Sequence, residues 1–442
     1  MVIDVALDEN VAAPDCWWTR AGKRLSALQM QVTVFHPGTQ HSWQTALALQ
    51  QLGRLESFRT SIFYQPDKFP YRLERVLPAP LAKRAAAEFR RFSHPGLDPA
   101  LVHTAGLAEW AERIAARVGL RGLAQSIDRI GNRQFVRHLA GSIRSDRQFA
   151  LWGFNGSSLS SFELAKQLGR TCILDRTNGD FRIYNTMMDE IAERYGDWFL
   201  PIERKVSAAD IAADEAEYRI ADAILVGSPF AADTIRHAVP DPAVQAKLRA
   251  LNYCYDEALF GAMPPPVPAA KSAPVRFLFM GLAIPRKGIH HVLEAIARIP
   301  RSEAELTIVG DLKIPPRMFA PYADRVTWIP PVARADVPAI MARHDVLVLP
   351  SYFEGAGIVL YEALASGCAL IQSDRCALAV TPETGLMLDR VDTDAVEAAM
   401  RAAISDRDRL ADWCRAAQVE ARNYTFTRYR DNIAAVLKDI GL

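Results

Sequence analysis

The sequence predicts an α/β protein with two doubly wound parallel-sheet domains that face each other across a cleft. Short β-rich runs alternate with longer helical patterns through most of the chain, a proline-rich stretch interrupts this alternation, and the alternation then restarts. Strands that alternate with helices favour a parallel sheet covered on both faces. With 442 residues the chain is also too long for one hydrophobic core, so we expect two domains of roughly 200 residues each.

The first part of the chain, residues 1–262, is expected to form the N-terminal domain. Residues 1–28 show no pattern that we can assign to an element. Runs rich in β-branched and aromatic residues predict strands within 31–38, 57–64, 149–154, 171–175 and 221–228. Apolar residues at helical spacing predict helices at 42–53, 160–169 and from 229, and mostly helical structure over 78–140 and 184–222.

The stretch GAMPPPVPAAKSAP at 261–274 marks a domain boundary, because consecutive prolines continue neither a helix nor a strand. We place the linker at 263–275, a second domain at 276–420 and an amphipathic C-terminal helix at 421–442. The second domain repeats the alternation of the first. Its strands are expected at 276–282, 305–311, 326–330, 346–351, 369–374 and 385–389, and its helices at 289–299, 337–344, 359–367 and 394–405.

The turn EGAG at 354–357 joins a predicted strand to a predicted helix and is the first candidate for a binding site. Ligands of such sheets bind beyond the carboxyl ends of the strands, where this turn lies. Gly355 and Gly357 let the backbone approach a ligand, and the free N–H groups at the start of the helix attract an anion such as a diphosphate.

Two glutamates accompany this turn. Glu354 lies in the turn and Glu362 lies about a turn and a half into the helix, so we expect them to contact different parts of one elongated ligand. Because carboxylates accept hydrogen bonds from hydroxyls, a ligand with hydroxyls at both ends and a diphosphate between them fits, and a nucleotide-sugar is such a molecule. The alternative is that Glu354 only caps the helix and that Glu362 is a solvated surface residue.

A second strand, turn and helix motif, FLFMGLAIPRKGIHHVLEA at 277–295, is expected at the same cleft. Gly281 ends its strand, and Arg286, Lys287 and Gly288 precede its helix. Two unit charges ~4 Å apart interact by ~4 kcal/mol at an effective dielectric constant of ~20. One or two cations at this place can therefore stabilise a departing diphosphate without a metal.

These motifs resemble those of glycosyltransferase family 4, a retaining family with the GT-B fold that takes sugar from an activated nucleotide donor. The likeness covers about 220–420 well and is faint upstream. The matching features are the pair Glu354 and Glu362, the preceding Pro350 and Ser351, the pattern of Gly281, Lys287 and Gly288, and the segments TIVGD, ILVGSPFAADTI and NYCYDEALF.

The resemblance implies a role for each matching residue. Lys287, with Arg286 as a second cation, would contact the donor diphosphate; Glu362 would bind the ribose hydroxyls, and Glu354 would lie near the donor sugar. The resemblance further implies front-face attack in which the leaving phosphate helps to deprotonate the acceptor, so no dedicated protein base is required. We expect neither a metal nor a cofactor. The last helix would pack back on the N-terminal domain. The other donor-side residues that it implies are Gly38, Gly281, Gly355, Ala356, Gly357 and Ile358.

Two positions depart from the family pattern. Many members have an arginine directly after the first glycine, where this chain has Leu282, and Arg286 is the alternative source of charge. Many also have a histidine at the end of an N-domain strand, where this chain has Trp152, with Asn155 and Ser157 as the nearby polar residues. Either the acceptor is held differently or the activity is weak.

Trp152 and Asn155 are candidates for the acceptor side of the cleft, and four further N-domain residues that follow strands are candidates as well. His36 and His41 follow the first strand, and their alternative role is to satisfy loop backbone. Asp175 and Arg176 end the strand TCILD, and their alternative role is an internal ion pair.

The sequence does not suggest a metal site or a disulfide. DTD at 392–394 opens a helix, with Glu397 three residues after Asp394, so we interpret it as a helix cap. His290 and His291 lack the spacing of paired metal ligands. The six cysteines form no C-x-x-C pair and are expected to be reduced and mostly buried.

The charge of the chain is unevenly distributed although its net charge is +1. Residues 54–147 hold 17 Lys and Arg against 9 Asp and Glu. Within PLAKRAAAEFRRF at 80–92, Leu81, Phe89 and Phe92 are expected to share a buried face, leaving the cations Lys83, Arg84, Arg90 and Arg91 in solvent. This segment is either a solvated surface helix or a contact with an anionic membrane.

Other compartments and functions were weighed on the same grounds. No apolar run reaches the ~18 residues of a membrane span and no signal peptide is recognisable, so we expect a cytoplasmic protein, with peripheral contact at the inner face of the membrane as the open alternative. Nucleic-acid binding is not indicated, because the basic run lacks interleaved aromatics. A dinucleotide-dependent oxidoreductase lacks its G-x-G-x-x-G fingerprint.

The predicted function is sugar transfer from a nucleotide-sugar to a glycan or lipid-linked hydroxyl acceptor, in polysaccharide or glycolipid assembly. A non-catalytic or weakly active GT-B protein, and an epimerase or phosphorylase on the same architecture, remain alternatives, because a fold alone does not fix the chemistry.

Overall fold

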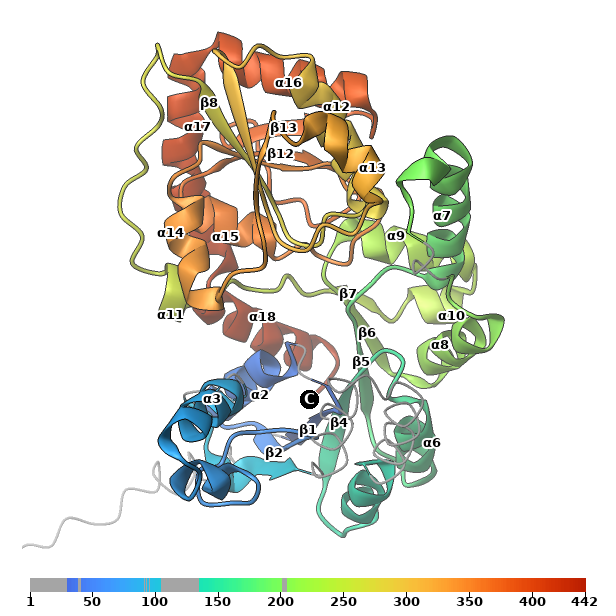
Figure 1. Cartoon of the computed structure of the whole chain (residues 1–442). Helices are drawn as coiled ribbons and strands as arrows, with labels where there is room; N and C mark the ends of the chain where they lie inside the picture. The colour runs from blue at the N-terminus through green and yellow to red at the C-terminus, as the bar shows by residue number, and fades with distance from the viewer. Residues whose placement is uncertain are drawn as a thin grey trace, which may run out of the picture.

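The computed structural model describes residues 30–38, 41–90, 92, 94, 96–104, 135–200 and 205–442. Figure 1 shows two lobes, one above the other, each containing a β-sheet with helices against it. Every pair of neighbouring strands in both sheets is parallel. The predicted fold class, two doubly wound parallel-sheet domains, is confirmed.

The N-terminal domain contains a seven-stranded sheet in the order β3-β2-β1-β4-β5-β6-β7. β3 and β7 were not predicted, because each has only three residues and lies at an edge of the sheet, so neither shows a recognisable pattern. The strands are β1 (Gln31–His36), β2 (Leu55–Thr60), β3 (Val102–Thr104), β4 (Phe149–Phe154), β5 (Cys172–Arg176), β6 (Ala223–Val226) and β7 (Leu248–Ala250).

The helical region predicted over 184–222 is divided into two helices, because Gly196 and the following turn interrupt it. Of the region predicted over 78–140, residues 105–134 lie outside the described part, and residues 135–143 are helical. The helices of this domain are α2 (Ser42–Gln51), α3 (Ala79–Arg90), α6 (Leu159–Gln167), α7 (Phe181–Tyr195), α8 (Ala208–Ile220), α9 (Pro229–Ala238), α10 (Pro242–Gln245) and α11 (Glu257–Phe260), with the 3-10 turns η1 (Tyr71–Arg75), η2 (Pro99–Leu101) and η3 (Gly196–Trp198).

The predicted buried face of the segment 80–92 is only partly correct. Phe89 and Phe92 are buried, but Leu81 is 51% exposed. The reason is that the start of α3 lies at the surface, where Lys83 is exposed as well. The side chains of the arginines at 84, 90 and 91 lie outside the described part.

The C-terminal domain contains a six-stranded sheet in the order β10-β9-β8-β11-β12-β13, and all six predicted strands are confirmed. The strands are β8 (Val275–Met280), β9 (Ala304–Val309), β10 (Thr327–Ile329), β11 (Val346–Leu349), β12 (Ala369–Ser373) and β13 (Gly385–Leu388). The helices are α12 (Ile289–Ala297), α13 (Pro316–Phe319), α14 (Val337–Met341), α15 (Val359–Ala365), α16 (Thr393–Ser405) and α17 (Arg407–Glu420), with the 3-10 turns η4 (Pro285–Lys287), η5 (Ala320–Tyr322), η6 (Arg334–Asp336) and η7 (Ala421–Tyr424).

The DTD segment is a helix cap, but the capping residue is Asp392. Its carboxylate accepts a hydrogen bond from the backbone N–H of Ala395 at 2.8 Å. Glu397 does not reach back to the helix start as expected, because it pairs with Arg298 and Arg401.

The two domains are joined at more than one place. After the linker, the chain returns through α18 (Phe426–Asp439), which packs on α2, and the hydroxyls of Thr45 and Tyr429 share a hydrogen bond of 2.8 Å. On the other side, α7 and η3 reach the C-terminal domain, where Trp198 is 5% exposed and belongs to the core cluster around β8 and α12. Tyr195 contacts the ring of His290 with 4.5 Å between ring centroids.

Within the described ranges, none of the helices combines the length and the apolar composition that a membrane span requires. The five cysteines in this part of the chain are buried and unpaired, as expected, whereas Cys16 lies outside it. The described residues also contain no group of three or more His, Cys, Asp or Glu side chains arranged to hold a metal ion.

Candidate active site between the two domains

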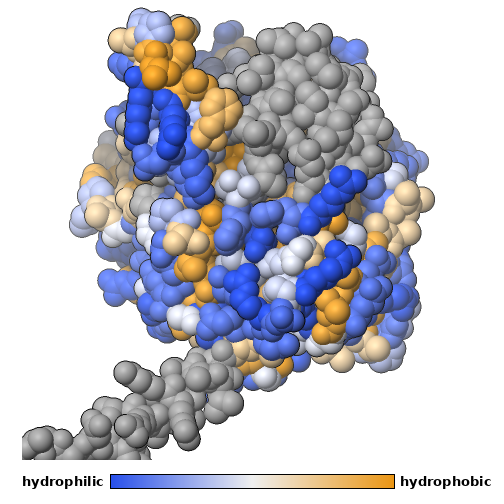
Figure 2. All heavy atoms as spheres, turned by 90° about the horizontal axis from the view of Figure 1, so that it is seen from below, coloured by the Kyte–Doolittle hydropathy of each residue, from blue (hydrophilic) through white to orange (hydrophobic). Residues whose placement is uncertain are grey.

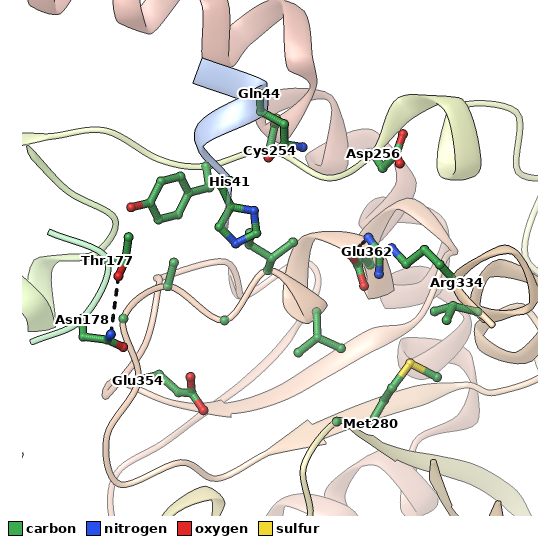
Figure 3. Close-up of a pocket in the computed structure, with 18 of the residues that line it drawn as sticks. His41, Gln44, Thr177, Asn178, Cys254, Asp256, Met280, Arg334, Glu354 and Glu362 are labelled. Atoms are coloured by element: carbon green, nitrogen blue, oxygen red, sulfur yellow. Dashed lines mark hydrogen bonds and ion pairs between the residues drawn. The ribbon is translucent and has the colours of Figure 1, made fainter. Parts of the chain in front are cut away.

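A pocket of about 680 Å³ lies between the carboxyl ends of the two sheets. Its C-terminal wall contains most of the residues that the sequence placed on the donor side. These are Gly281, Lys287, Glu354, Gly355, Ala356, Gly357, Ile358 and Glu362. Figure 3 shows Glu354 on one side of the pocket and Glu362 on the other, with His41 pointing from the start of α2 into the space between them.

The first ion pair of the pocket joins the two sequence motifs. Lys287 Nζ lies 2.6 Å from Glu354 Oε1, and a guanidinium nitrogen of Arg286 lies 3.3 Å from the same oxygen. Burial disfavours the charged form of Glu354, but the two cations outweigh it and lower the pKa of this carboxyl. The site therefore keeps the Glu354 carboxylate ionised at neutral pH beside two basic side chains.

Close backbone packing holds the two motif loops together. The backbone N–H of Tyr352 donates to the carbonyl of Arg286 at 2.9 Å. Gly288 has φ +69°, and a Cβ there would lie 2.2 Å from the carbonyl oxygen of Pro350, so only glycine fits. Arg286 donates to the carbonyl of Phe353 and does not line the pocket, so it fixes the EGAG loop as well as supplying charge.

The second carboxylate of the pocket, Glu362, is only 4% exposed, so its interpretation as a solvated surface residue is wrong. Glu354 does not cap α15 either, because the N-cap residue is Ile358 and no side chain caps this helix. Glu362 pairs with Arg334, whose guanidinium also lies over the ring of Phe260. Burial raises the pKa of Glu362, and Arg334 opposes that shift.

The N-terminal wall of the pocket is formed by residues that mostly escaped the sequence analysis. Besides His41 it contains Trp43, Gln44, Thr177, Asn178 and Tyr253. His41 packs on Tyr253 with 5.4 Å between ring centroids, and burial lowers the pKa of its imidazole, so His41 is neutral at pH 7. Thr177 and Asn178 come two and three residues after the predicted strand 171–175. Their position beyond the carboxyl end of a strand was the signal that could have revealed them. Arg334, in the C-terminal wall, had no such signal.

Gly38 and His36 do not line the pocket. They bond to each other, because the backbone N–H of Gly38 donates to Nδ1 of His36 at 2.9 Å, and His36 is 8% exposed. The alternative role of His36, satisfying loop backbone, is the one that the geometry supports.

Trp152 and Asp175 lie inside the N-terminal domain and not in the pocket, which corrects the expectation that they face the acceptor. Both are at most 1% exposed, because they belong to the central strands β4 and β5. Asp175 accepts hydrogen bonds from the hydroxyl of Tyr253 at 2.6 Å and from the indole N–H of Trp152 at 3.3 Å. Asp175 thus holds Tyr253, which does line the pocket.

Asn155 and Arg176 also lie behind the pocket wall, contrary to expectation. Arg176 is fully buried and forms an internal ion pair, although with Asp214 and not with Asp175. Asn155 Oδ1 accepts hydrogen bonds from the backbone N–H and the hydroxyl of Thr177 at 3.0 and 2.9 Å. Both residues support the loop that lines the pocket.

The architecture defines a class. The chain has the GT-B fold, in which two Rossmann-like domains enclose a site at the interface of their sheets. Two solved structures of this fold cover nearly all of the chain. One is the sucrose-phosphate synthase of Thermosynechococcus elongatus, with a TM-score of 0.61, 16% identity, and coverage of 93% of this chain and 99% of that one. The other is Anabaena HepE in complex with UDP-glucose, with a TM-score of 0.59, 12% identity, and coverage of 93% and 100%.

At the level of sequence, residues 266–420 match the family model of group 1 glycosyl transferases. A curated relative, the D-inositol 3-phosphate glycosyltransferase of Rhodococcus opacus (strain B4), is 30% identical over 153 residues, which are 32% of this chain and 34% of that relative. The chain therefore spans about a third of the length of the curated relatives that it matches first. The residues that match the family model, 266–420, contain the Lys287 motif, the EGAG turn and Glu362.

Proposed function

We propose that this protein is a retaining, metal-independent glycosyltransferase of the family 4 type. It transfers a sugar from a nucleoside diphosphate sugar to a hydroxyl of a glycan or lipid-linked acceptor. The observation that carries this proposal is the Lys287–Glu354 pair beside Gly281 and the EGAG turn, at the C-terminal wall of the pocket between the domains. The match of residues 266–420 to group 1 glycosyl transferases supports it, as does the UDP-glucose bound by HepE.

In this proposal the donor diphosphate replaces Glu354 as the partner of Lys287. The phosphate oxygens attract Lys287 Nζ, which lies 2.6 Å from Oε1 of the glutamate. Glu354 is then available to accept hydrogen bonds from sugar hydroxyls. Glu362, on the far side of His41, accepts hydrogen bonds from the ribose hydroxyls. The donor thus extends across the pocket between the two glutamates, as Figure 3 allows.

The transfer step exchanges one bond at the anomeric carbon of the donor sugar. The bond from this carbon to the diphosphate oxygen breaks, and the bond to the acceptor oxygen forms on the same face. The proton of the acceptor hydroxyl passes to the departing phosphate oxygen, so no side chain has to act as a base. The cations Lys287 and Arg286 stabilise the charge that develops on the diphosphate.

A thermal-shift screen tests the donor site. We would measure the melting temperature with UDP, GDP, ADP, dTDP and their common sugar conjugates, with EDTA and with magnesium. A nucleoside diphosphate that raises the melting temperature equally with EDTA and with magnesium supports the proposal. Lys287→Ala should abolish the shift, whereas Lys271→Ala, which removes a lysine whose side chain is 71% exposed, should preserve it. No shift with any nucleotide, or a shift that requires magnesium, would contradict the proposal.

A lipid-linked acceptor would require contact with a membrane surface, and the segment around η1 and the start of α3 offers one. Figure 2 shows the end of the molecule formed by the N-terminal domain, where hydrophobic residues reach the surface among hydrophilic ones. We define an N-domain ridge by the exposed apolar residues Phe69, Leu73, Val76 and Leu81 and the interleaved cations Lys68, Arg72, Arg75 and Lys83. Apolar side chains among cations fit the boundary between headgroups and acyl chains of an anionic bilayer.

Co-sedimentation with vesicles tests this part of the proposal. The protein should bind vesicles that contain phosphatidylglycerol more strongly than vesicles of phosphatidylcholine alone. Phe69→Ser with Val76→Ser should reduce that binding at least about fivefold, because these side chains are 64% and 77% exposed. Equal binding to both kinds of vesicle, or full binding by the double variant, would exclude this membrane contact.

A further inference from the structure

The residue that precedes Glu354 is anchored in the opposite domain. Phe353 belongs to a loop of the C-terminal domain, yet its side chain is only 3% exposed. Tyr184 of α7 and Phe230 of α9 contact its ring edge to face, with centroid separations of 5.3 and 5.4 Å. A Cβ at Gly179 would lie 2.7 Å from the tip of the same ring. Phe353 is therefore inserted into a recess of the N-terminal domain.

The backbone of the EGAG turn touches the N-terminal domain as well. The hydroxyl of Ser228 donates to the carbonyl of Gly355 at 2.5 Å. A Cβ at Gly355 would lie 1.7 Å from the carbonyl oxygen of Thr177, so the two backbones are in direct contact. The turn that carries Glu354 is thus held from outside its own domain.

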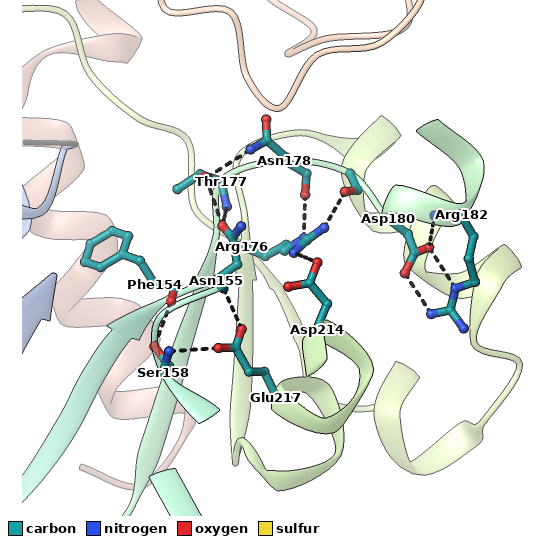
Figure 4. A network of polar contacts seen from close by, with 12 residues as sticks. Phe154, Asn155, Ser158, Arg176, Thr177, Asn178, Asp180, Arg182, Asp214 and Glu217 are labelled. Atoms are coloured by element: carbon teal, nitrogen blue, oxygen red, sulfur yellow. Dashed lines mark hydrogen bonds and ion pairs between the residues drawn. The ribbon is translucent and has the colours of Figure 1, made fainter. Parts of the chain in front are cut away.

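The N-domain loop at 177–179 that receives the turn is itself fixed. Figure 4 shows Arg176 pointing into this loop, where its guanidinium donates to the carbonyls of Asn178 and Gly179 at 3.0 and 2.7 Å and pairs with Asp214. A buried charge is tolerated only when its partners satisfy it, and these bonds satisfy Arg176 on several sides. Asn155 holds Thr177 at the other end of the loop. The loop is a firm support for the turn.

Lys287 differs from Glu354 in this respect, because no described N-domain residue is hydrogen-bonded or ion-paired to it. Among the described residues, the side chain of Lys287 is thus bonded only within the C-terminal domain, although η4, which carries it, lies against α7. Glu354 instead directly follows a side chain that is inserted into the N-terminal domain. Displacements of about 1 Å at a catalytic group cost about 100-fold in rate. A shift of the Phe353 side chain out of its recess is therefore expected to change the distance between Lys287 Nζ and Glu354 Oε1.

We propose that Phe353 is a positioning residue for Glu354, and that the N-domain loop at 177–179 is the surface against which it sets the EGAG turn. The inference rests on the proposed function, because it assigns to Glu354 the contact with the donor sugar. According to this inference, turnover requires that the two domains lie close enough for Phe353 to be inserted into its recess. Nucleotide contacts at Gly281, Lys287 and Glu362 are expected not to depend on it, since the aromatic partners of the Phe353 ring are Tyr184 and Phe230 of the N-terminal domain.

Hydrogen exchange tests the positioning contact without any substrate. In Phe353→Ala the backbone amide of Glu354, which donates to the carbonyl of Arg375 at 3.0 Å, should exchange about tenfold faster than in the wild type, because the support of the turn is lost. Phe353→Leu, which refills most of the recess, should restore much of the protection. The matched control is Phe319→Ala, which removes a phenylalanine from the same domain at α13, far from this turn in sequence. Unchanged exchange in Phe353→Ala would overturn the inference.

Kinetics with the nucleotide-sugar found in the thermal-shift screen test the consequence. Phe353→Ala should lower kcat about 10- to 100-fold and change the affinity for the corresponding nucleoside diphosphate less than about threefold. Tyr184→Ala should act through the same contact, so the double variant should be no slower than the worse single variant. A folded Phe353→Ala with wild-type kcat, or a parallel loss of kcat and nucleotide affinity, would contradict the positioning role. If the wild type binds no nucleotide, the proposed function fails and the positioning role for Glu354 falls with it, whatever the exchange experiment shows.

Discussion

The two walls of the pocket differ in which kinds of residue reach the pocket. In the C-terminal wall, Lys287, Glu354 and Glu362 come from short motifs that directly follow strands, and all three line the pocket. In the N-terminal wall, of the polar residues chosen by the same logic only His41 reaches the pocket. Asn155, Asp175 and Arg176 instead hold residues that do. The comparison teaches that a side chain within a central strand is more often a support than a ligand, even when it lies at the carboxyl end of that strand.

The largest loss of activity is expected when a charged group of the C-terminal wall is removed. Lys287→Ala and Glu354→Gln should each lower kcat about 100- to 1000-fold, because each removes a fixed charge from the reacting centre. Steady-state kinetics would measure this loss. Lys271→Ala serves as the control, since it removes a lysine whose side chain is 71% exposed. Turnover of either site variant within about threefold of the wild type would place the chemistry elsewhere.

The next largest effect is expected when the contact between the two walls is disrupted. Gly355→Ala adds a methyl group 1.7 Å from the Thr177 carbonyl, so the turn and the N-terminal domain must separate. We expect a loss of about 2–4 kcal/mol in the free energy of unfolding and a fall of at least about tenfold in kcat. Gly196→Ala is the matched control, because no atom lies within 4 Å of its added methyl group. Urea unfolding and kinetics that match the wild type would show that this close approach is not needed.

A smaller effect is expected from Asp175, which holds Tyr253 of the N-terminal wall. Burial raises the pKa of Asp175 to about 6 although Tyr253 and Trp152 donate hydrogen bonds to it. The folded protein therefore holds this proton more tightly than the unfolded chain. The resulting stability is fully present below the unfolded pKa of about 4 and is lost as the pH rises through about 6, a change of about 3 kcal/mol at most.

Urea unfolding at pH 4.5 and pH 7.5 measures this pH dependence. Relative to the wild type, Asp175→Asn should gain up to about 3 kcal/mol between the two pH values, because its side chain does not titrate. A constant difference between wild type and variant at both pH values would mean that Asp175 is ionised throughout.

The smallest effect concerns the ribose side of the C-terminal wall. Arg334→Ala leaves Glu362 buried without its cation, so the pKa of this carboxyl rises further. A protonated carboxyl accepts hydrogen bonds poorly, and nucleoside diphosphate affinity should fall about tenfold at pH 7 and more at pH 6. Isothermal titration at both pH values measures it. An affinity loss that is the same at both pH values would assign Arg334 a direct contact with the nucleotide instead.

Much of the fold was predictable because the sequence patterns of the strands and of the helices are both strong. All six strands of the C-terminal sheet and five of the seven strands of the other were expected, and the two that were missed are three-residue edge strands. The exposure of Leu81 was not predictable, because helical spacing places residues on one face but does not say whether anything covers that face. Arg334 was missed for a related reason, since its ion pair with Glu362 spans 28 residues.

The sequence by itself determined most of the order of elements and three of the charged residues in the C-terminal wall, namely Lys287, Glu354 and Glu362. These follow from local patterns, since a glycine turn or a cation after a strand acts within a few residues of its own position. Only the tertiary structure decided that Asp175 and Arg176 are interior supports and that Phe353 is inserted into the opposite domain. Burial and contact across 169 residues of chain, as between Phe353 and Tyr184, depend on how the two sheets approach each other, and no local pattern encodes that approach.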